Sequence, residues 1–189
     1  MIRSILAYPF LAMLIVAGTS GREVVTPAEA LRRLQETGLL EQVEVTSGLY
    51  IENLFDEEGM IIERVEVAGG LYIENLSTGE EGLVTIEDVR VNGDLVINGL
   101  GAKTLQLGGV GVVDGHLKLT RINVNNLQIV MTAIDNTLEM RDCPERFRIA
   151  LRFQKPPKWI DVDSLALAQR VFYALPDKNI SIRIADYDD

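Results

Sequence analysis

The sequence has one cysteine, one histidine and few aromatic residues. Cys143 alone cannot form a disulfide within the chain, and together with His116 it cannot supply the ligands of a Cys/His zinc cage. The chain also lacks the GxSxG, HExxH, Walker and dinucleotide-binding patterns of common catalytic and nucleotide sites. These absences exclude a disulfide-stabilised scaffold, and no motif remains that points to a class of enzyme.

Positive charge is also scarce, because 28 acidic residues outnumber 18 lysines and arginines and give a net charge of −10. Binding to nucleic acid requires clustered cations. We therefore expect no nucleic-acid partner and no docking onto anionic lipid. Apolar residues make up 47% of the chain, which is typical of a globular protein with a buried core.

The longest apolar run lies at the start of the chain. Arg3 is followed by apolar residues from Ile5 to Ala17, interrupted by Pro9, and then by the small residues GTSG. This order predicts a secretory signal peptide over residues 1–20, with an uncleaved membrane anchor or a buried helix as alternatives. The expected location is secreted, periplasmic or cell-surface, with membrane contact only through this segment.

A motif recurs along the rest of the chain, beginning with the near-identical segments SGLYIENL and GGLYIENL. Counted from the leading Leu, each copy has an apolar or Cys residue at its first, third and sixth positions, and polar residues at most of the positions between. The five copies are led by Leu49, Leu71, Leu95, Leu117 and Leu138, at spacings of 22, 24, 22 and 21 residues. Alternation of this kind predicts short strands that are buried on one side.

Such a short coil of strands cannot bury its apolar side alone, so successive coils must stack and share one core. The residues expected to form one interior ladder are Ile51, Ile73, Ile97, Leu119 and Met140. The predicted fold is an all-β solenoid, a right-handed parallel β-helix of about five coils of 21–24 residues, with short helical caps at both ends. A leucine-rich-repeat-like solenoid is the alternative. Cys143 takes a repeat position held elsewhere by Leu or Ile and is interpreted as a core residue.

The LYIENL-type segments resemble the rungs of secreted right-handed parallel β-helix proteins over residues 43–153. This resemblance implies the fold and no particular family or activity. Residues 21–42 are expected to form an N-terminal capping helix that starts at Thr26 and stops at Gly38. Residues 154–189 are expected to form a C-terminal cap, with a helix capped by Asp163 and a strand through Ile180, Ile182 and Ile184.

The candidate binding residues lie on the outward side of the leading strand of each coil. They are Tyr50, Tyr72, Glu52, Glu74, Lys118, Glu139 and Arg141. Stacked tyrosines and acids suit a cell-surface protein or a glycan. No cofactor is expected, since the acidic clusters at 56–58 and 80–81 suit Ca²⁺ but do not follow a known ligand spacing.

The leading hypothesis is a non-catalytic, exported, adhesin-like module that serves as a rigid interaction or surface-structural element. One alternative is a self-assembling scaffold whose coils stack end to end, and the oligomeric state is left open. The other is a polysaccharide-active enzyme with Glu139 and Arg141 beside Lys118. The enzyme hypothesis is disfavoured because the corners of the coil are predicted to be uniformly short, too short to build the wall of a groove.

Overall fold

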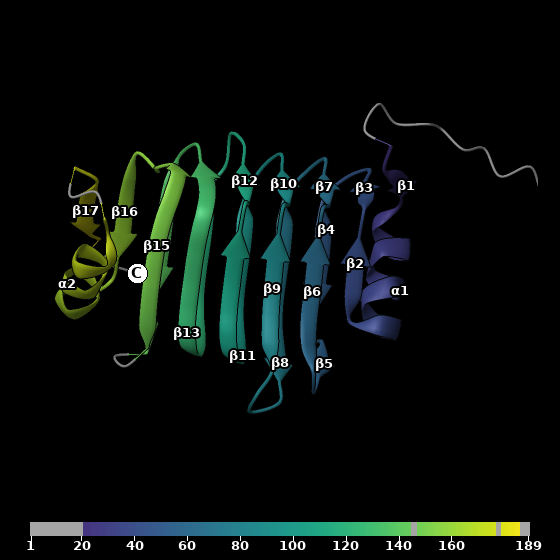
Figure 1. Ribbon diagram of the computed structural model, residues 1–189, viewed down its shortest axis with the longest axis horizontal. Helices are drawn as coiled ribbons and strands as arrows, with labels where there is room; N and C mark the ends of the chain where they lie inside the picture. Colours follow the sequence, from purple (N-terminus) through teal and green to yellow (C-terminus); the bar gives the residue numbers. More distant parts are fainter. Residues whose placement is uncertain (1–20, 145–146, 177–178, 186–189) are drawn as a thin grey trace, which may run out of the picture.

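The computed structural model describes residues 21–144, 147–176 and 179–185, so the predicted signal peptide lies outside the described residues. The fold is mostly parallel β-sheet, curled into a solenoid-like stack with one helix near each end (Figure 1). Within the described ranges, neither helix is both long and apolar enough to cross a membrane. The prediction of an all-β parallel solenoid is thus confirmed at this level.

The strands form three parallel ladders, named here after residues that they carry. The tyrosine ladder contains β4 (Leu49–Glu52), β8 (Leu71–Thr78), the first parts of β11 (Leu95–Gly108) and β13 (Leu117–Ile134), β14 (Thr137–Arg141), β16 (Trp159–Val162) and β17 (Ser181–Ile184). The amide ladder contains β2 (Leu39–Glu41), β6 (Gly59–Glu63), β9 (Leu83–Glu87), the later parts of β11 and β13, and β15 (Arg148–Lys155). The valine ladder contains β1 (Glu23–Val25), β3 (Val43–Val45), β7 (Glu66–Val67), β10 (Arg90–Val91), β12 (Gly111–Val112) and the end of β13. The short β5 (Phe55–Asp56) pairs with the end of β8.

The repeated apolar residues fill the space between the ladders. In the tyrosine ladder, Ile51 pairs with Ile73, Ile73 with Ile97, Ile97 with Leu119, and Leu119 with Met140. All five side chains are fully buried. The predicted interior ladder is therefore confirmed residue by residue. Thr132 is buried at the end of β13, where its hydroxyl donates to a backbone carbonyl, that of Leu107 or of Val130.

Two of the three bends in each coil contain a residue with a left-handed backbone, and the third contains a positive φ at Gly93 (156°) and Asp114 (57°). Between the tyrosine and amide ladders these residues are Asn53, Asn75, Gly99, Arg121 and Asp142. Between the amide and valine ladders they are Gln42, Arg64, Asp88, Gly109 and Met131. Gly, Asn and Asp adopt this conformation readily, whereas it strains a side chain such as that of Met131.

The third bend, between the valine and tyrosine ladders, is crowded, and we call it the glycine bend (Gly69, Gly93, Gly115). A Cβ atom added at Gly115 would lie 2.0 Å from the carbonyl oxygen of Gly93. A Cβ atom added at Gly69 would lie 2.7 Å from the backbone nitrogen of Gly48. Glycine is needed here because neighbouring backbones touch.

The helix α1 (Pro27–Thr37) lies beyond the first strands of the stack (Figure 1). Its predicted limits are confirmed, since the Thr26 hydroxyl accepts from the Glu29 N–H at 3.3 Å and Gly38 ends the helix with φ 66°. The segments on either side of it, β1 and β2, pair with β3 and β6. Residues 21–42 therefore contribute strands to the stack as well as the helix.

The helix α2 (Leu165–Ala174) lies at the other end, beside β15, β16 and β17 (Figure 1). The prediction that Asp163 caps it is wrong, because the hydroxyl of Ser164 accepts from the Leu167 N–H and makes Ser164 the N-cap. Leu165 and Phe172 are exposed, and Leu167 packs inward with Val171. The buried side of α2 is therefore made by Leu167 and Val171, which lie one turn apart.

Candidate functional site

The tyrosines predicted to stack do so on the outward side of the tyrosine ladder. The rings of Tyr50 and Tyr72 lie with centroids 4.5 Å apart and an interplanar angle of 6°. Tyr50 is 57% exposed, while Tyr72 is half-buried and lies close over Gly70. Burial, and next the neighbouring Tyr50, raise the pKa of the Tyr72 hydroxyl. The pair thus offers a neutral aromatic surface with hydrogen-bonding groups.

The acids beside the tyrosines also lie in register. Glu52 pairs directly with Glu74 across β4 and β8, and both side chains face outward. At the next bend the amide of Asn75 donates to the amide oxygen of Asn53 at 3.3 Å. Like charges on neighbouring strands repel. This part of the surface therefore favours a partner that brings positive charge.

Lys118 also lies on this side. Its ion-pair partner is Asp94, which was not among the residues predicted from the sequence. The Lys118 ammonium donates to the Asp94 carboxylate at 2.9 Å, and the other carboxylate oxygen accepts from the backbone N–H of His116 at 2.8 Å. Burial raises the pKa of Asp94, but the hydrogen bonds from Lys118 and His116 together outweigh it, so the net pKa is lowered. Asp94 occupies the repeat position that Gly48 and Gly70 hold in earlier coils. This change from Gly to Asp along the repeat is the sequence signal that could have identified Asp94.

Glu139 and Arg141 lie on the next strand. The guanidinium of Arg141 donates to the Glu139 carboxylate at 3.1 Å. The other Glu139 oxygen lies 4.0 Å from Nδ1 of His116. Glu139 pairs in register with Lys118. The structure therefore brings the predicted Lys118, Glu139 and Arg141 together on β13 and β14, in two ion pairs, Lys118 with Asp94 and Arg141 with Glu139.

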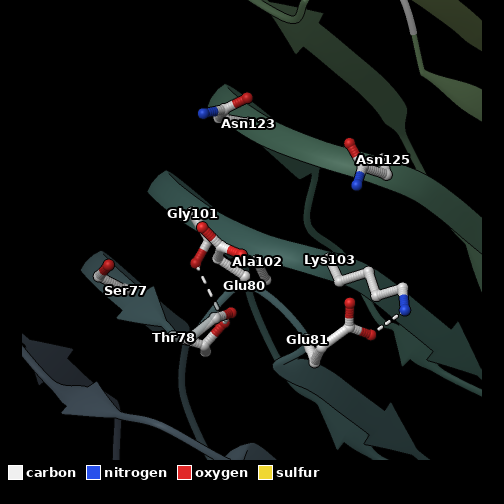
Figure 2. Close-up of a pocket in the computed structure, with 10 residues that line it drawn as sticks. Ser77, Thr78, Glu80, Glu81, Gly101, Ala102, Lys103, Asn123 and Asn125 are labelled. Carbon is white, nitrogen blue, oxygen red and sulfur yellow. Dashed lines mark hydrogen bonds and ion pairs between the residues drawn. The ribbon is translucent and has the colours of Figure 1, made fainter.

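A second surface feature lies at the bend between the tyrosine and amide ladders. It is a hollow of about 490 Å³, lined by Ser77, Thr78, Gly79, Glu80, Glu81, Gly101, Ala102, Lys103, Asn123 and Asn125. Figure 2 shows Asn123 and Asn125 on one strand, Gly101 and Ala102 on the next, and Glu81 beside Lys103. Its volume is within the range of small-molecule sites, roughly 300–1,000 Å³. The expectation that no corner builds a groove wall is thus wrong at this bend.

The wall arises from two extra residues in one coil. The spacing from Leu71 to Leu95 is 24 residues, compared with 22 on either side, and the insertion falls in the segment STGEEG. This segment projects as a loop between β8 and β9 (Figure 1). Glu81 forms an ion pair with Lys103, and the Thr78 hydroxyl donates to the Gly101 carbonyl at 3.3 Å. These two contacts tie the loop and the end of β8 to β11.

The floor of the hollow is open because Gly101 has no side chain. We call this bend the open bend (Ser77, Gly101, Asn123), three residues that pair in register across β8, β11 and β13. A Cβ atom added at Gly101 would meet only the Ser77 hydroxyl, at 3.8 Å. The exposed Phe55 is the next residue of the same row.

Next to the hollow lies an outward side of the amide ladder, which we call the amide face. Its polar side chains are Thr85, Thr104, Gln106, Asn126 and Gln128, and the exposed apolar side chain of Leu83 lies in register beside Thr104. At the open bend the alternation of inward and outward residues breaks, because Asn125 and Asn126 both lie between the buried Val124 and Leu127. Within the described residues, the side chains of Asn123, Asn125, Gln106 and Gln128 make no hydrogen bond to the protein, whereas Asn126 donates to Thr104 at 3.2 Å.

The acidic cluster at 56–58 has a structural role in part. The Asp56 carboxylate accepts from the backbone N–H groups of Glu58, at 2.9 Å, and Gly59, at 3.3 Å. In the part of the chain that the structure describes, no three His, Cys, Asp or Glu side chains come together to hold a metal ion.

Cys143 packs against the hydrophobic core, as predicted. Burial raises the pKa of its thiol to about 12. A thiol with such a pKa is almost wholly protonated at neutral pH and is a poor nucleophile. A catalytic role for Cys143 is therefore disfavoured.

Comparison with known protein families, curated proteins and solved structures finds no match to this chain. The surfaces described above are thus the basis for assigning a function, because a solenoid fold serves many functions.

Proposed function

We propose that this chain is a non-catalytic, exported module that binds a cell-surface protein through the outward side of its tyrosine ladder. In this proposal the stack is a right-handed parallel β-helix of about five coils of 21–24 residues, and α1 and α2 act as its caps. The rigid ladder fixes the positions of the tyrosines and charges before a partner arrives. Such preorganisation lowers the entropic cost of binding.

The observation that supports this proposal is the stacked pair of Tyr50 and Tyr72 on an exposed strand. Tyrosine is enriched among the residues that dominate protein interfaces, because it presents a large, stiff, amphipathic surface. Glu52 and Glu74 lie two residues further along the same strands and supply charge at the rim. A partner with a basic rim would complement this arrangement.

Photo-crosslinking tests the proposed interface. A photoreactive phenylalanine analogue in place of Tyr50 should capture a protein on intact cells, and the same group at the exposed Met131, next to the valine ladder, should not. Tyr72→Ala should then weaken binding of the purified partner at least about tenfold, as expected for an interface hot spot. Equal capture at both positions, or unchanged affinity of Tyr72→Ala, would contradict the proposal.

Export is tested separately by the mass of the protein recovered outside the cytoplasm. Removal of a peptide ending near residue 20 is expected for a cleaved signal. An exported form that retains Met1 would remove the cleaved-signal part of the proposal and leave the membrane anchor.

End-to-end assembly is the second candidate, and one observation favours it. Among the described strands, β17 pairs only with β16, so its outer edge is open, and Ile184 on it is 45% exposed. An open strand edge is a template for pairing with another chain. Sedimentation over a wide concentration range tests it, and a constant monomer would exclude it. The enzyme alternative has less support, because Glu139 and Arg141 pair with each other on the ladder and lie away from the hollow.

A further inference from the structure

We propose that the hollow at the open bend and the adjoining amide face form a binding site for an uncharged glycan. This inference deepens the proposed interaction function and rests on it, but it concerns a different surface from the tyrosine pair.

The first argument is the low charge of the amide face. The chain carries −10 overall, yet the polar side chains of the amide face are all uncharged. The charges nearest to them are Glu87 on β9 and, in the hollow, Glu80 and the ion pair of Lys103 with Glu81. On one side the neighbouring strand β15 carries Arg148 and Arg152, and on the other Glu63 of β6 pairs in register with Glu87. A neutral surface inside a charged protein complements a neutral partner, since a charged ligand would lose hydration there without gaining an opposite charge.

The second argument is the chemistry of the available groups. The amides of Asn123, Asn125, Gln106 and Gln128 each offer two N–H donors and a carbonyl acceptor, and none is used by the described protein. Neighbouring hydroxyls of a sugar ring both donate and accept, so a planar amide can pair with two of them at once. The hydroxyls of Ser77 and Thr85 add further groups of either kind.

The third argument is shape. Ser77, Gly101 and Asn123 lie in one row across three strands, with roughly 4.8 Å between neighbours. The missing side chain at Gly101 leaves a floor on which a ring can rest, while the exposed Phe55 ends the row. An aromatic ring at the end of a polar row suits the apolar C–H side of a sugar.

These features favour a glycan over a protein at this surface. Protein interfaces have an apolar core rich in aromatic residues. The hollow and the amide face are lined mainly by amides, hydroxyls and glycine. Acidic polymers are disfavoured by Glu80 and the net charge of the chain.

Native gel electrophoresis of the full chain through soluble polysaccharides tests this site. The probes are a neutral β-glucan, mannan and xylan, with alginate and polygalacturonate as acidic polymers. We expect retardation by at least one neutral polymer. Gly101→Leu fills the floor and should weaken that retardation at least about tenfold. Gly111→Leu is the matched control. A Cβ atom at Gly111 meets nothing within 4 Å, and Gly111 lies on the valine ladder, away from the hollow.

The double variant Asn123→Ala/Asn125→Ala provides a second test that does not fill the site, and it should reduce retardation as well. Thermal melts of each variant establish that it is folded. Retardation by no neutral polymer, by acidic polymers alone, or equally for wild type and Gly101→Leu overturns the inference. A dimer in sedimentation that Gly101→Leu disrupts also overturns it, because the occupant is then a second copy.

The tyrosine pair distinguishes this inference from the proposed function. Tyr72→Ala should weaken binding of the purified protein partner without changing retardation by the neutral polymer. Loss of retardation in Gly101→Leu with unchanged Tyr50 crosslinking supports the glycan site alone. Retardation that depends on Tyr72 instead of Gly101 overturns the placement at the open bend.

Discussion

The glycine bend precedes each central strand of the tyrosine ladder, and the open bend follows it. The two bends come from the same repeat but differ in how closely successive coils approach each other. At the glycine bend the backbones of successive coils touch, and a Cβ atom at Gly115 would lie 2.0 Å from the Gly93 carbonyl oxygen. At the open bend a Cβ atom at Gly101 meets nothing closer than 3.8 Å. A glycine is thus required for packing at one bend, whereas at the other it leaves room on the surface.

The largest expected effect tests the crowded side of this comparison. Gly115→Ala should lower the free energy of unfolding by about 3 kcal/mol, because the added methyl group meets backbone atoms that cannot rotate away. Gly111→Ala should change it by less than about 0.5 kcal/mol. Urea unfolding of both variants measures the difference. A Gly115→Ala protein as stable as Gly111→Ala would mean that the coils do not touch at this bend.

The contrast between crowded and open positions also explains which parts of the structure can be predicted from the sequence. Where backbones or core side chains touch, few residue types fit, so the apolar ladder through Ile73 and Ile97 and the cap at Thr26 could be predicted from the sequence. Outward residues are restricted less, and a run of neutral polar residues such as NVNN looks like any solvated strand. The amide face and the hollow were therefore missed. The 24-residue spacing was the available signal, and its consequence depends on where the extra residues project.

The next effect concerns a bend that is neither crowded nor open. Met131 has a left-handed backbone, with φ 55°, and its side chain is 56% exposed. Met131→Gly should raise the free energy of unfolding by about 0.5–1 kcal/mol, since relief of backbone strain exceeds the added flexibility of the unfolded chain. Met131→Ala keeps the strain and is the control. Thermal unfolding of the two variants separates strain from loss of the side chain.

A smaller effect depends on pH. Asp94 occupies a glycine position in the glycine bend, and its lowered pKa means that the folded state favours the carboxylate. Its contribution is present above the unfolded-state pKa of about 4 and is lost as the pH falls through the lower folded value. Between pH 6 and pH 3, wild type should lose more stability than Asp94→Asn, by less than about 1 kcal/mol because the pair is partly exposed. Parallel urea titrations at the two pH values measure it, and equal losses would show that the ion pair with Lys118 has no influence.

The smallest expected effect is the most informative about the open bend. Gly101→Leu adds a large side chain, yet the free energy of unfolding should stay within about 0.5 kcal/mol of wild type, because the side chain projects into the hollow and the backbone there needs no left-handed conformation. Gly111→Leu is again the control for adding leucine to an exposed strand. If Gly101→Leu loses as much stability as Gly115→Ala, the open bend is packed in solution and the hollow does not exist there. If it is as stable as the control, the fold does not require glycine at this position, as expected for a glycine that lines a binding site.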